Sequence, residues 1–182
     1  MVWFWYFIAY SFLGFLLEVV YAKATGGRRE RKCLLLLPLC PVYGLGVCLI
    51  LLLSGPVKAF PPMLFLTGAA GATAVEYLTS LFYEKLLGVS FWDYQELHGN
   101  LHGRVCLPFS VAWGILTLPT VYWLHPAVAP LAAAIPLPVG SAAFVTLLTD
   151  CTLSALLLRK HRDISCLSWW GGLLKSDSSL RQ

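Results

Sequence analysis

Long apolar segments recur along this chain, and each is long enough to cross a lipid bilayer. A helix needs about 20 mostly apolar residues to span the hydrocarbon core. Of the 182 residues, 58% are hydrophobic and 12% are charged, a composition typical of a membrane protein. The segments run from about Val2 to Ala22, Cys33 to Leu53, Met63 to Tyr83, Val105 to Leu124 and Leu131 to Leu158. The sequence therefore predicts an all-α, polytopic membrane helix bundle with about five transmembrane helices.

Basic residues are concentrated in alternate connections between these segments. All of the 13 Lys and Arg residues except Lys58 fall on one side of the membrane if the chain crosses it five times. The positive-inside rule assigns that side to the cytoplasm, so we expect the N-terminus outside and the C-terminus in the cytoplasm. Residues 1–167 then form a single transmembrane helical domain, and residues 168–182 form a short cytoplasmic tail with Trp169 and Trp170 at the interface. The net charge of +4 follows from this arrangement and does not indicate nucleic-acid binding.

Acidic residues occur inside three of the apolar segments. Glu18, Glu76 and Asp150 lie at similar distances from the basic residues that end their segments. An ionisable group costs at least about 2.5 kcal/mol at membrane depth unless it faces the bundle interior and finds a partner. Tyr77 lies beside Glu76 on a polar helix face. We therefore expect the acids to face one another in a cytoplasm-facing polar cavity, with a structural role as the alternative.

The second segment is interrupted by helix-breaking residues. The stretch "PLCPVYGLG", Pro38 to Gly46, contains two prolines and two glycines, and it includes Cys40, Pro41 and Tyr43. Proline interrupts a helix, and irregular backbone at membrane depth is tolerated where protein or a water-filled cavity surrounds it. The sequence predicts a broken or re-entrant element near the start of the second span, with Tyr43 directed toward the acids.

Polar residues are also concentrated in the connection before the fourth segment, which reads "FWDYQELHGNLHGRVCLPFS". We expect its polar and aromatic residues to close the cavity from the cytoplasmic side, with Arg104 neutralising the acids or binding an anionic ligand. The candidate residues are Trp92, Asp93, Tyr94, Asn100 and Arg104. His98 and His102 have the spacing of a helical zinc site, but Gly99 and Gly103 argue against a helix there, so no metal site is predicted.

The cysteines do not have the spacing of a redox or zinc motif. The chain has six, and none of them forms a C-x-x-C pair. Most lie in apolar segments or on the expected cytoplasmic side, which argues against a disulfide framework. Cys40 has no adjacent basic partner that would activate it as a nucleophile. We expect no cofactor.

The motifs "EVVY", "CPVYGLG", "EYLTSLFYEKLLGVSFWDY" and "NLHGRVCLPFSVAWG" together resemble a bacterial family of integral membrane proteins, the ABC-transporter type IV or CmpB-like family. The resemblance covers roughly residues 12–113. It implies a location in the bacterial cytoplasmic membrane and a role in transport. The matching positions are Glu18, Cys40, Pro41, Tyr43, Gly44, Glu76, Trp92, Asp93, Tyr94, Asn100, Gly103 and Arg104.

Two classes of function remain open from the sequence. In the first, the chain is a permease-like transport subunit with a site for a cation, a proton-coupled solute or an amphiphile. It contains no G-x-x-x-x-G-K-[ST] motif, so an ATP-driven role requires a separate ATPase subunit, which the connection from Leu86 to Gly103 is placed to dock. In the second, it is an enzyme acting on a lipid at the cytoplasmic leaflet, with Glu76 and Asp93 as acid and base. Gly68, Gly71 and Ala72 are suited to close helix packing within the bundle or in a homo-oligomer.

Overall fold

The computed structural model describes residues 1–25 and 33–167, and within these ranges it is built from helices. The α-helices are α1 (Val2–Ala24), α2 (Pro41–Ser54), α3 (Pro61–Phe82), α4 (Leu107–Pro119), α5 (His125–Ala133) and α6 (Leu137–His161). Two single π-turns, η1 (Tyr83–Leu87) and η2 (Thr120–Leu124), extend α3 and join α4 to α5. A 3₁₀ turn, η3 (Ile164–Leu167), ends the described chain. The prediction of an all-α helical bundle is confirmed. The predicted tail 168–182, with Trp169 and Trp170, lies outside the described residues.

Proline sets the start of most of these helices. α2, α3, α4 and α6 each have a proline in the first turn, where its missing N–H leaves no hydrogen bond unmade. α6 begins at Leu137, immediately after Pro136 and later than the expected start of the last segment at Leu131. Residues 125–130 were expected in the connection before that segment, and residues 125–133 instead form the separate helix α5.

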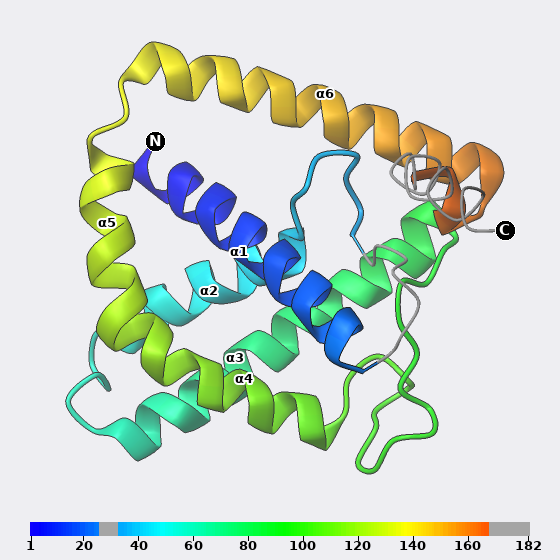
Figure 1. Ribbon diagram of the computed structural model, residues 1–182. Coiled ribbons are helices and arrows are strands. Elements are labelled where there is room, and N and C mark those ends of the chain that lie inside the picture. Colours follow the sequence, from blue (N-terminus) through cyan, green and yellow to red (C-terminus); the bar gives the residue numbers. More distant parts are fainter. Residues whose placement is uncertain (26–32, 168–182) are drawn as a thin grey trace, which may run out of the picture.

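The helices run between two ends of the bundle (Figure 1). The first residue, the loop containing Lys58 and the start of α6 lie at the left in this view, and we call this the Lys58 end. The ends of α1, α3 and α6 lie at the right with the loop 88–106, and we call this the Arg104 end. The chain turns sharply between α4 and α5, so α5 runs along the Lys58 end. Pro119 and the π-turn at Thr120–Leu124 supply a physical cause for that bend.

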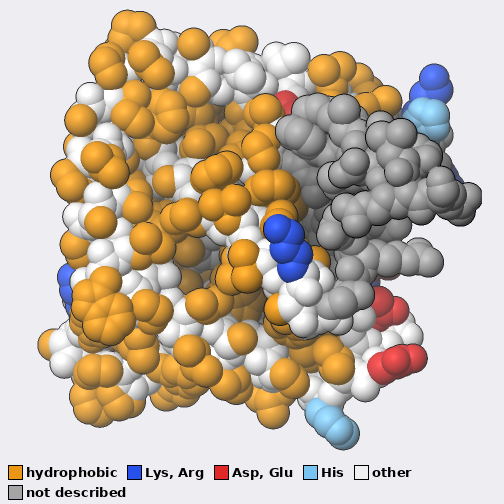
Figure 2. All heavy atoms as spheres, viewed as in Figure 1, with side chains coloured by type: hydrophobic (Ala, Val, Ile, Leu, Met, Phe, Trp, Pro, Cys, Tyr) orange, Lys and Arg blue, Asp and Glu red, His pale blue; other side chains and the backbone are white. Residues whose placement is uncertain are grey.

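The outer surface is suited to lipid. Within residues 1–25 and 33–167, three helical stretches are long and apolar enough to cross a membrane. They are Val2–Ala24, Leu107–Ala133 (α4, η2 and α5 together) and Leu137–His161, and Pro41–Ser54 is a shorter apolar helix. Large apolar side chains on several helices point outward, and in Figure 2 they cover most of the visible described surface with few charged groups among them. A soluble protein rarely exposes an apolar surface of this extent. The chain is a membrane protein.

Glycine allows the helices to approach closely. A side-chain carbon at Gly68 would lie 2.0 Å from the hydroxyl of Thr117 on α4, and one at Gly14 would lie 2.2 Å from the ring of Tyr43 on α2. Gly71 faces Leu49 and Leu53 on α2. The small residues of α3 thus pack within the bundle, as is common for membrane helices.

A non-helical segment, residues 33–40, lies between α1 and α6 (Figure 1). Leu35 and Leu39 are buried there in one cluster with Leu147 of α6, and the backbone N–H of Cys40 donates to the carbonyl of Ser11. The expectation of an irregular element before the second helix agrees with this segment, which is surrounded by protein as its free backbone groups require.

The cysteine prediction was wrong for one pair. Cys33 and Cys40, at the two ends of this segment, form a disulfide, and their Cα atoms are 5.0 Å apart. The cysteine spacing did not indicate this pairing, because the conformation of the short loop between the two residues depends on its packing against α1 and α6. Cys48, Cys106, Cys151 and Cys166 are free thiols.

Candidate functional site

Tyr43 of α2 contacts side chains of α1 and α4 at the centre of the bundle. Its hydroxyl donates to Glu18 Oε1 at 2.7 Å, and its ring packs against Trp113 with the centroids 4.9 Å apart. Tyr43 can reach Glu18 because Gly14, one turn earlier on α1, leaves room for its ring. The proline at the start of α2 places Tyr43 in the first turn, close to the end of α1.

Glu76 is buried beside this pair and accepts two side-chain hydrogen bonds. Trp113 Nε1 donates to Oε2 and the hydroxyl of Tyr94 donates to Oε1, both at 3.0 Å. Burial and the nearby Glu76 carboxylate raise the pKa of the Tyr94 phenol, which keeps it protonated as a donor. Hydrogen bonds therefore join α3 to α4 and to the loop 88–106 around one carboxylate.

The two carboxylates are linked through a pair of packed rings, because Tyr43 donates to Glu18 and packs against Trp113, which donates to Glu76. Within the described residues, no Lys or Arg forms an ion pair with either of them; the ion pair there is between Arg104 and Glu84. Neutral donors therefore supply their observed contacts, and the site retains an affinity for a proton or a cationic group.

Asp150 lies apart from this arrangement. Its carboxylate accepts hydrogen bonds from the backbone N–H groups of Leu36 and Leu37, at 3.1 and 2.9 Å, and from the hydroxyl of Ser154 at 3.2 Å. These contacts fix the 33–40 segment against α6. The structure brings Glu18 and Glu76 together, and it gives Asp150 a structural partner elsewhere.

Arg104 is directed toward the surface of the Arg104 end. Its guanidinium group pairs with Glu84 and lies 5.6 Å from the centre of the Tyr77 ring. Its backbone carbonyl accepts a hydrogen bond from Trp92 Nε1 at 2.9 Å. The structure thus gives Arg104 a different carboxylate partner from the one expected from the sequence.

The remaining candidates in the loop hold its own conformation. Asp93 Oδ1 accepts from the backbone N–H of Gln95, and Asn100 Nδ2 donates to the carbonyls of Gln95 and Leu97. The loop turns through Gly99 and Gly103, both with positive φ, which glycine adopts without a steric penalty. His102 Nδ1 is hydrogen-bonded to the hydroxyl of Tyr77 at 3.1 Å. Among the residues that the structure describes, the observed partners of Asp93 and Glu76 are different, and no contact couples the two as acid and base.

Cys40 and Pro41 affect the site through the start of α2. Cys40 precedes α2 and is held in the disulfide with Cys33, so it is no free nucleophile. Pro41 opens α2. Both therefore act on the site through the placement of Tyr43.

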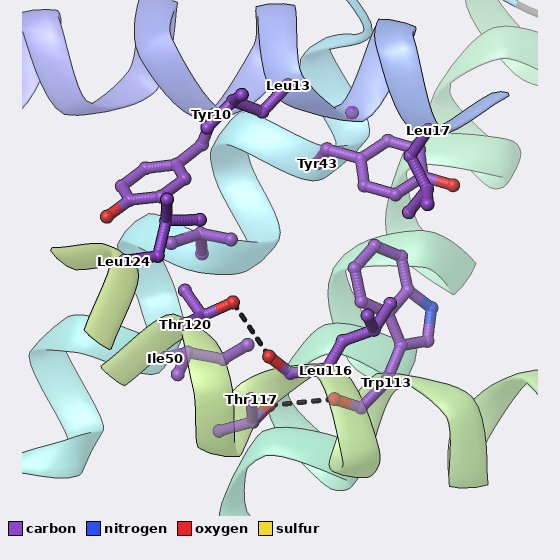
Figure 3. Close-up of a pocket in the computed structure, with 12 residues that line it drawn as sticks. Tyr10, Leu13, Leu17, Tyr43, Ile50, Trp113, Leu116, Thr117, Thr120 and Leu124 are labelled. Carbon is purple, nitrogen blue, oxygen red and sulfur yellow. Dashed lines mark hydrogen bonds between the residues drawn. The ribbon is translucent and has the colours of Figure 1, made fainter. Parts of the chain in front are cut away.

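A cavity of about 200 Å³, which we call the central pocket, lies between α1, α2 and α4 (Figure 3). Its polar groups have partners: the hydroxyls of Thr117 and Thr120 donate to the carbonyls of Trp113 and Leu116 on their own helix. The hydroxyls of Tyr10 and Tyr43 point to opposite ends of the pocket. The lining residues are Tyr10, Leu13, Gly14, Leu17, Tyr43, Val47, Ile50, Trp113, Leu116, Thr117, Thr120 and Leu124. Carbon therefore dominates its wall, and the acids lie beyond the rings of Tyr43 and Trp113.

A second cavity of about 310 Å³, which we call the vestibule, lies toward the Lys58 end. Its lining includes polar side chains that reach the surface there. The residues are Val2, Trp3, Tyr6, Leu51, Ser54, Lys58, Val121 and His125. Between the vestibule and the central pocket, the hydroxyl of Tyr10 is hydrogen-bonded to His125 Nδ1 at 3.1 Å.

Trp113, Tyr10 and His125 are the residues that reasoning from the sequence missed. The indole of Trp113 carries an N–H that needs a partner when buried, and this is the signal that could have paired it with an acid. Tyr10 and His125 are 115 positions apart, and nothing in the sequence links them.

Comparison with known proteins gives one match. No curated protein and no solved structure matches this chain. The match is to a family model that covers residues 5–155, most of the chain and all of the residues that surround the central pocket. The chain belongs to the family described as "Putative ABC-transporter type IV", the CmpB-like family whose motifs it resembles.

Proposed function

We propose that this protein is a permease-like transport subunit whose central pocket holds the apolar part of an amphiphile. The observation that carries the proposal is an apolar pocket inside the bundle whose wall includes the rings of Tyr43 and Trp113, which donate hydrogen bonds to two carboxylates behind them. Within the described residues, neither carboxylate forms an ion pair with a Lys or Arg. An apolar wall with a few polar groups at one end is the usual form of a small-molecule site. Membership of an ABC-transporter family supports the assignment to transport.

The polar group of the amphiphile meets Glu18 and Tyr43. Because Tyr43 is a neutral donor, an ammonium group that takes its place at Glu18 adds the attraction of two opposite charges to the hydrogen bond. Glu76, fixed by Trp113 and Tyr94, supplies a second negative charge nearby. A protonated amine with an apolar body is the ligand class that fits.

Transport by such a chain needs a partner and an orientation. The loop 88–106 lies at the Arg104 end and exposes Leu97 and Leu101, which gives an ATPase subunit a surface to dock on. With the basic residues at that end in the cytoplasm, the loop faces the side where ATP is available. The protein then acts in the bacterial cytoplasmic membrane.

The test is native mass spectrometry of protein extracted with dodecylamine added as the probe. A Leu116→Trp substitution fills the pocket. Ile115→Trp, at the preceding residue of α4, leaves the pocket lining unchanged. We expect wild type and Ile115→Trp to retain dodecylamine and Leu116→Trp to lose it. Glu18→Gln weakens retention of dodecylamine more than of dodecanol, because the alcohol carries no charge. Equal retention by all the variants would contradict the proposal.

A further inference from the structure

We infer that the vestibule and the central pocket are two parts of one path through the bundle, and that the Tyr10–His125 hydrogen bond is the barrier between them. The inference rests on the proposed transport function. It adds a route from the Lys58 end and assigns a role to the contact between Tyr10 and His125.

The two cavities lie in the same interface between the same helices. Along α2, Tyr43, Val47 and Ile50 face the pocket, and Leu51 and Ser54 face the vestibule. Along α1 the vestibule residues end at Tyr6, and the pocket residues begin one turn later at Tyr10. Residues spaced by three or four positions share one helix face, so each helix turns a continuous face toward both cavities.

The barrier is formed by side chains that meet across this interface. Tyr10 is 2% exposed, its hydroxyl is bonded to His125, and the His125 ring packs edge-on against Tyr6 at 4.8 Å. Val121, 2% exposed, lies one turn before His125 in η2. Opening the path therefore requires the Tyr10–His125 contact to break.

The backbone provides a place for that movement. His125 begins α5 directly after the π-turn Thr120–Leu124, whose residues line both cavities. Single π-turns within helices are often found at functional sites and bends. A small rotation of α5 about this turn moves His125 away from Tyr10 and leaves α4 and Trp113 in place.

The path carries a solute whose surface is mostly apolar. The hydroxyls that line the central pocket are engaged by partners in the protein, so a polar solute would lose its hydration there without replacement. The vestibule has Lys58 and Ser54 in its lining and therefore holds water. The solute passes through it on entry or on exit.

Cysteine accessibility tests this inference without any transport assay. The background keeps the Cys33–Cys40 disulfide and replaces the free thiols at 48, 106, 151 and 166 by serine. Ser54→Cys reports on the vestibule, and Ile50→Cys, one turn earlier on α2, reports on the pocket. Each is treated with a charged, membrane-impermeant methanethiosulfonate in intact cells and in inverted vesicles, and the side on which Ser54→Cys reacts identifies the Lys58 end.

We expect Ile50→Cys to react much more slowly than Ser54→Cys when Tyr10 is intact. Tyr10→Phe removes the hydrogen bond, and it raises the rate at Ile50→Cys about fivefold, the ratio that one net hydrogen bond of ordinary strength supplies. Tyr10→Ala, which also removes the ring, raises it further. Tyr21→Ala, on the exposed part of α1, leaves both rates unchanged.

Two results would overturn the inference. One is an equal rate at Ile50→Cys and Ser54→Cys with Tyr10 intact, and the other is a rate at Ile50→Cys that neither Tyr10 variant changes. If Tyr10→Ala does not fold, His125→Asn tests the same contact from α5. If the path opens but the protein binds no dodecylamine, the proposed function is contradicted and the path is still supported. If the protein binds dodecylamine but the path does not open, the path is contradicted and the proposed function is still supported.

Discussion

Tyr43 of α2 donates its phenolic hydrogen to Glu18 of α1 at 2.7 Å, and the contact joins two helices at the level of the central pocket. A carboxylate inside a membrane bundle that loses its donor keeps the cost of leaving water and loses the compensating bond. This relationship makes Tyr43 the residue by which α2 stabilises the acid of α1.

We expect Tyr43→Phe to lower the free energy of unfolding by about 2 kcal/mol, since a hydrogen bond to a charged group contributes about that much. The measurement is thermal unfolding in detergent. Tyr21→Phe is the control, because Tyr21 is 52% exposed on α1, the helix that carries Glu18. An equal shift in both variants would show that the Glu18 contact contributes nothing particular.

Asp150 should contribute to the stability of the 33–40 segment and not to ligand binding. Asp150→Ala leaves the backbone N–H groups of Leu36 and Leu37 without this acceptor, and we expect a loss of about 2–4 kcal/mol in stability. Limited proteolysis should then cut more rapidly near the segment. Thr149→Ala, its exposed neighbour, should change neither quantity. Undiminished dodecylamine binding in folded Asp150→Asn would agree with this structural role, and its loss would contradict it.

The disulfide can be tested by counting the cysteines that react before and after reduction. Of the six cysteines, the four free ones should take a maleimide tag in denatured protein that has not been reduced, and reduction should expose the other two. Intact mass gives the number of tags. Cys33→Ser should leave Cys40 free, so that reduction no longer changes the count. A wild-type protein that takes all its tags before reduction would show that the pair is not formed in the cell.

Close packing at Gly68 should be sensitive to a single methyl group. Gly68→Ala places a carbon 2.0 Å from the Thr117 hydroxyl, so we expect destabilisation by about 1–3 kcal/mol from overpacking. Gly55→Ala is the matched control, because nothing lies within 4 Å of the added carbon and the backbone there is right-handed. The unfolding temperatures of the two variants make the comparison, and similar values would argue against tight α3–α4 contact at this point.

The helical fold was predictable because apolar length and proline position are local signals. Segment limits agreed with the helices within a few residues at α1 and α3, where no break occurs. Residues 125–133 were misassigned because the bend before α5 arises from a π-turn that hydropathy does not register.

The site was predictable in part for a different reason. Glu18, Tyr43 and Glu76 stood out as polar groups in apolar segments, and the structure brings them to one place. Asp150 stood out by the same signal, yet its partner is the backbone of a loop, which leaves no trace in the side-chain pattern. Arg104 was paired with the wrong acid, because Glu84, which directly follows the third expected segment, was not among the candidate acids.

The π-turn at Thr120–Leu124 also constrains how the gene for this protein can change. Such a turn accommodates one residue more than the α-helical repeat, and each residue turns a helix by about 100°. Deleting a single codon there would remove that extra residue, so the helix would become regular and the residues after it would keep nearly the same facing. A single-residue deletion at this turn is therefore tolerable where one in the regular part of α4, which turns every later residue by about 100°, is not.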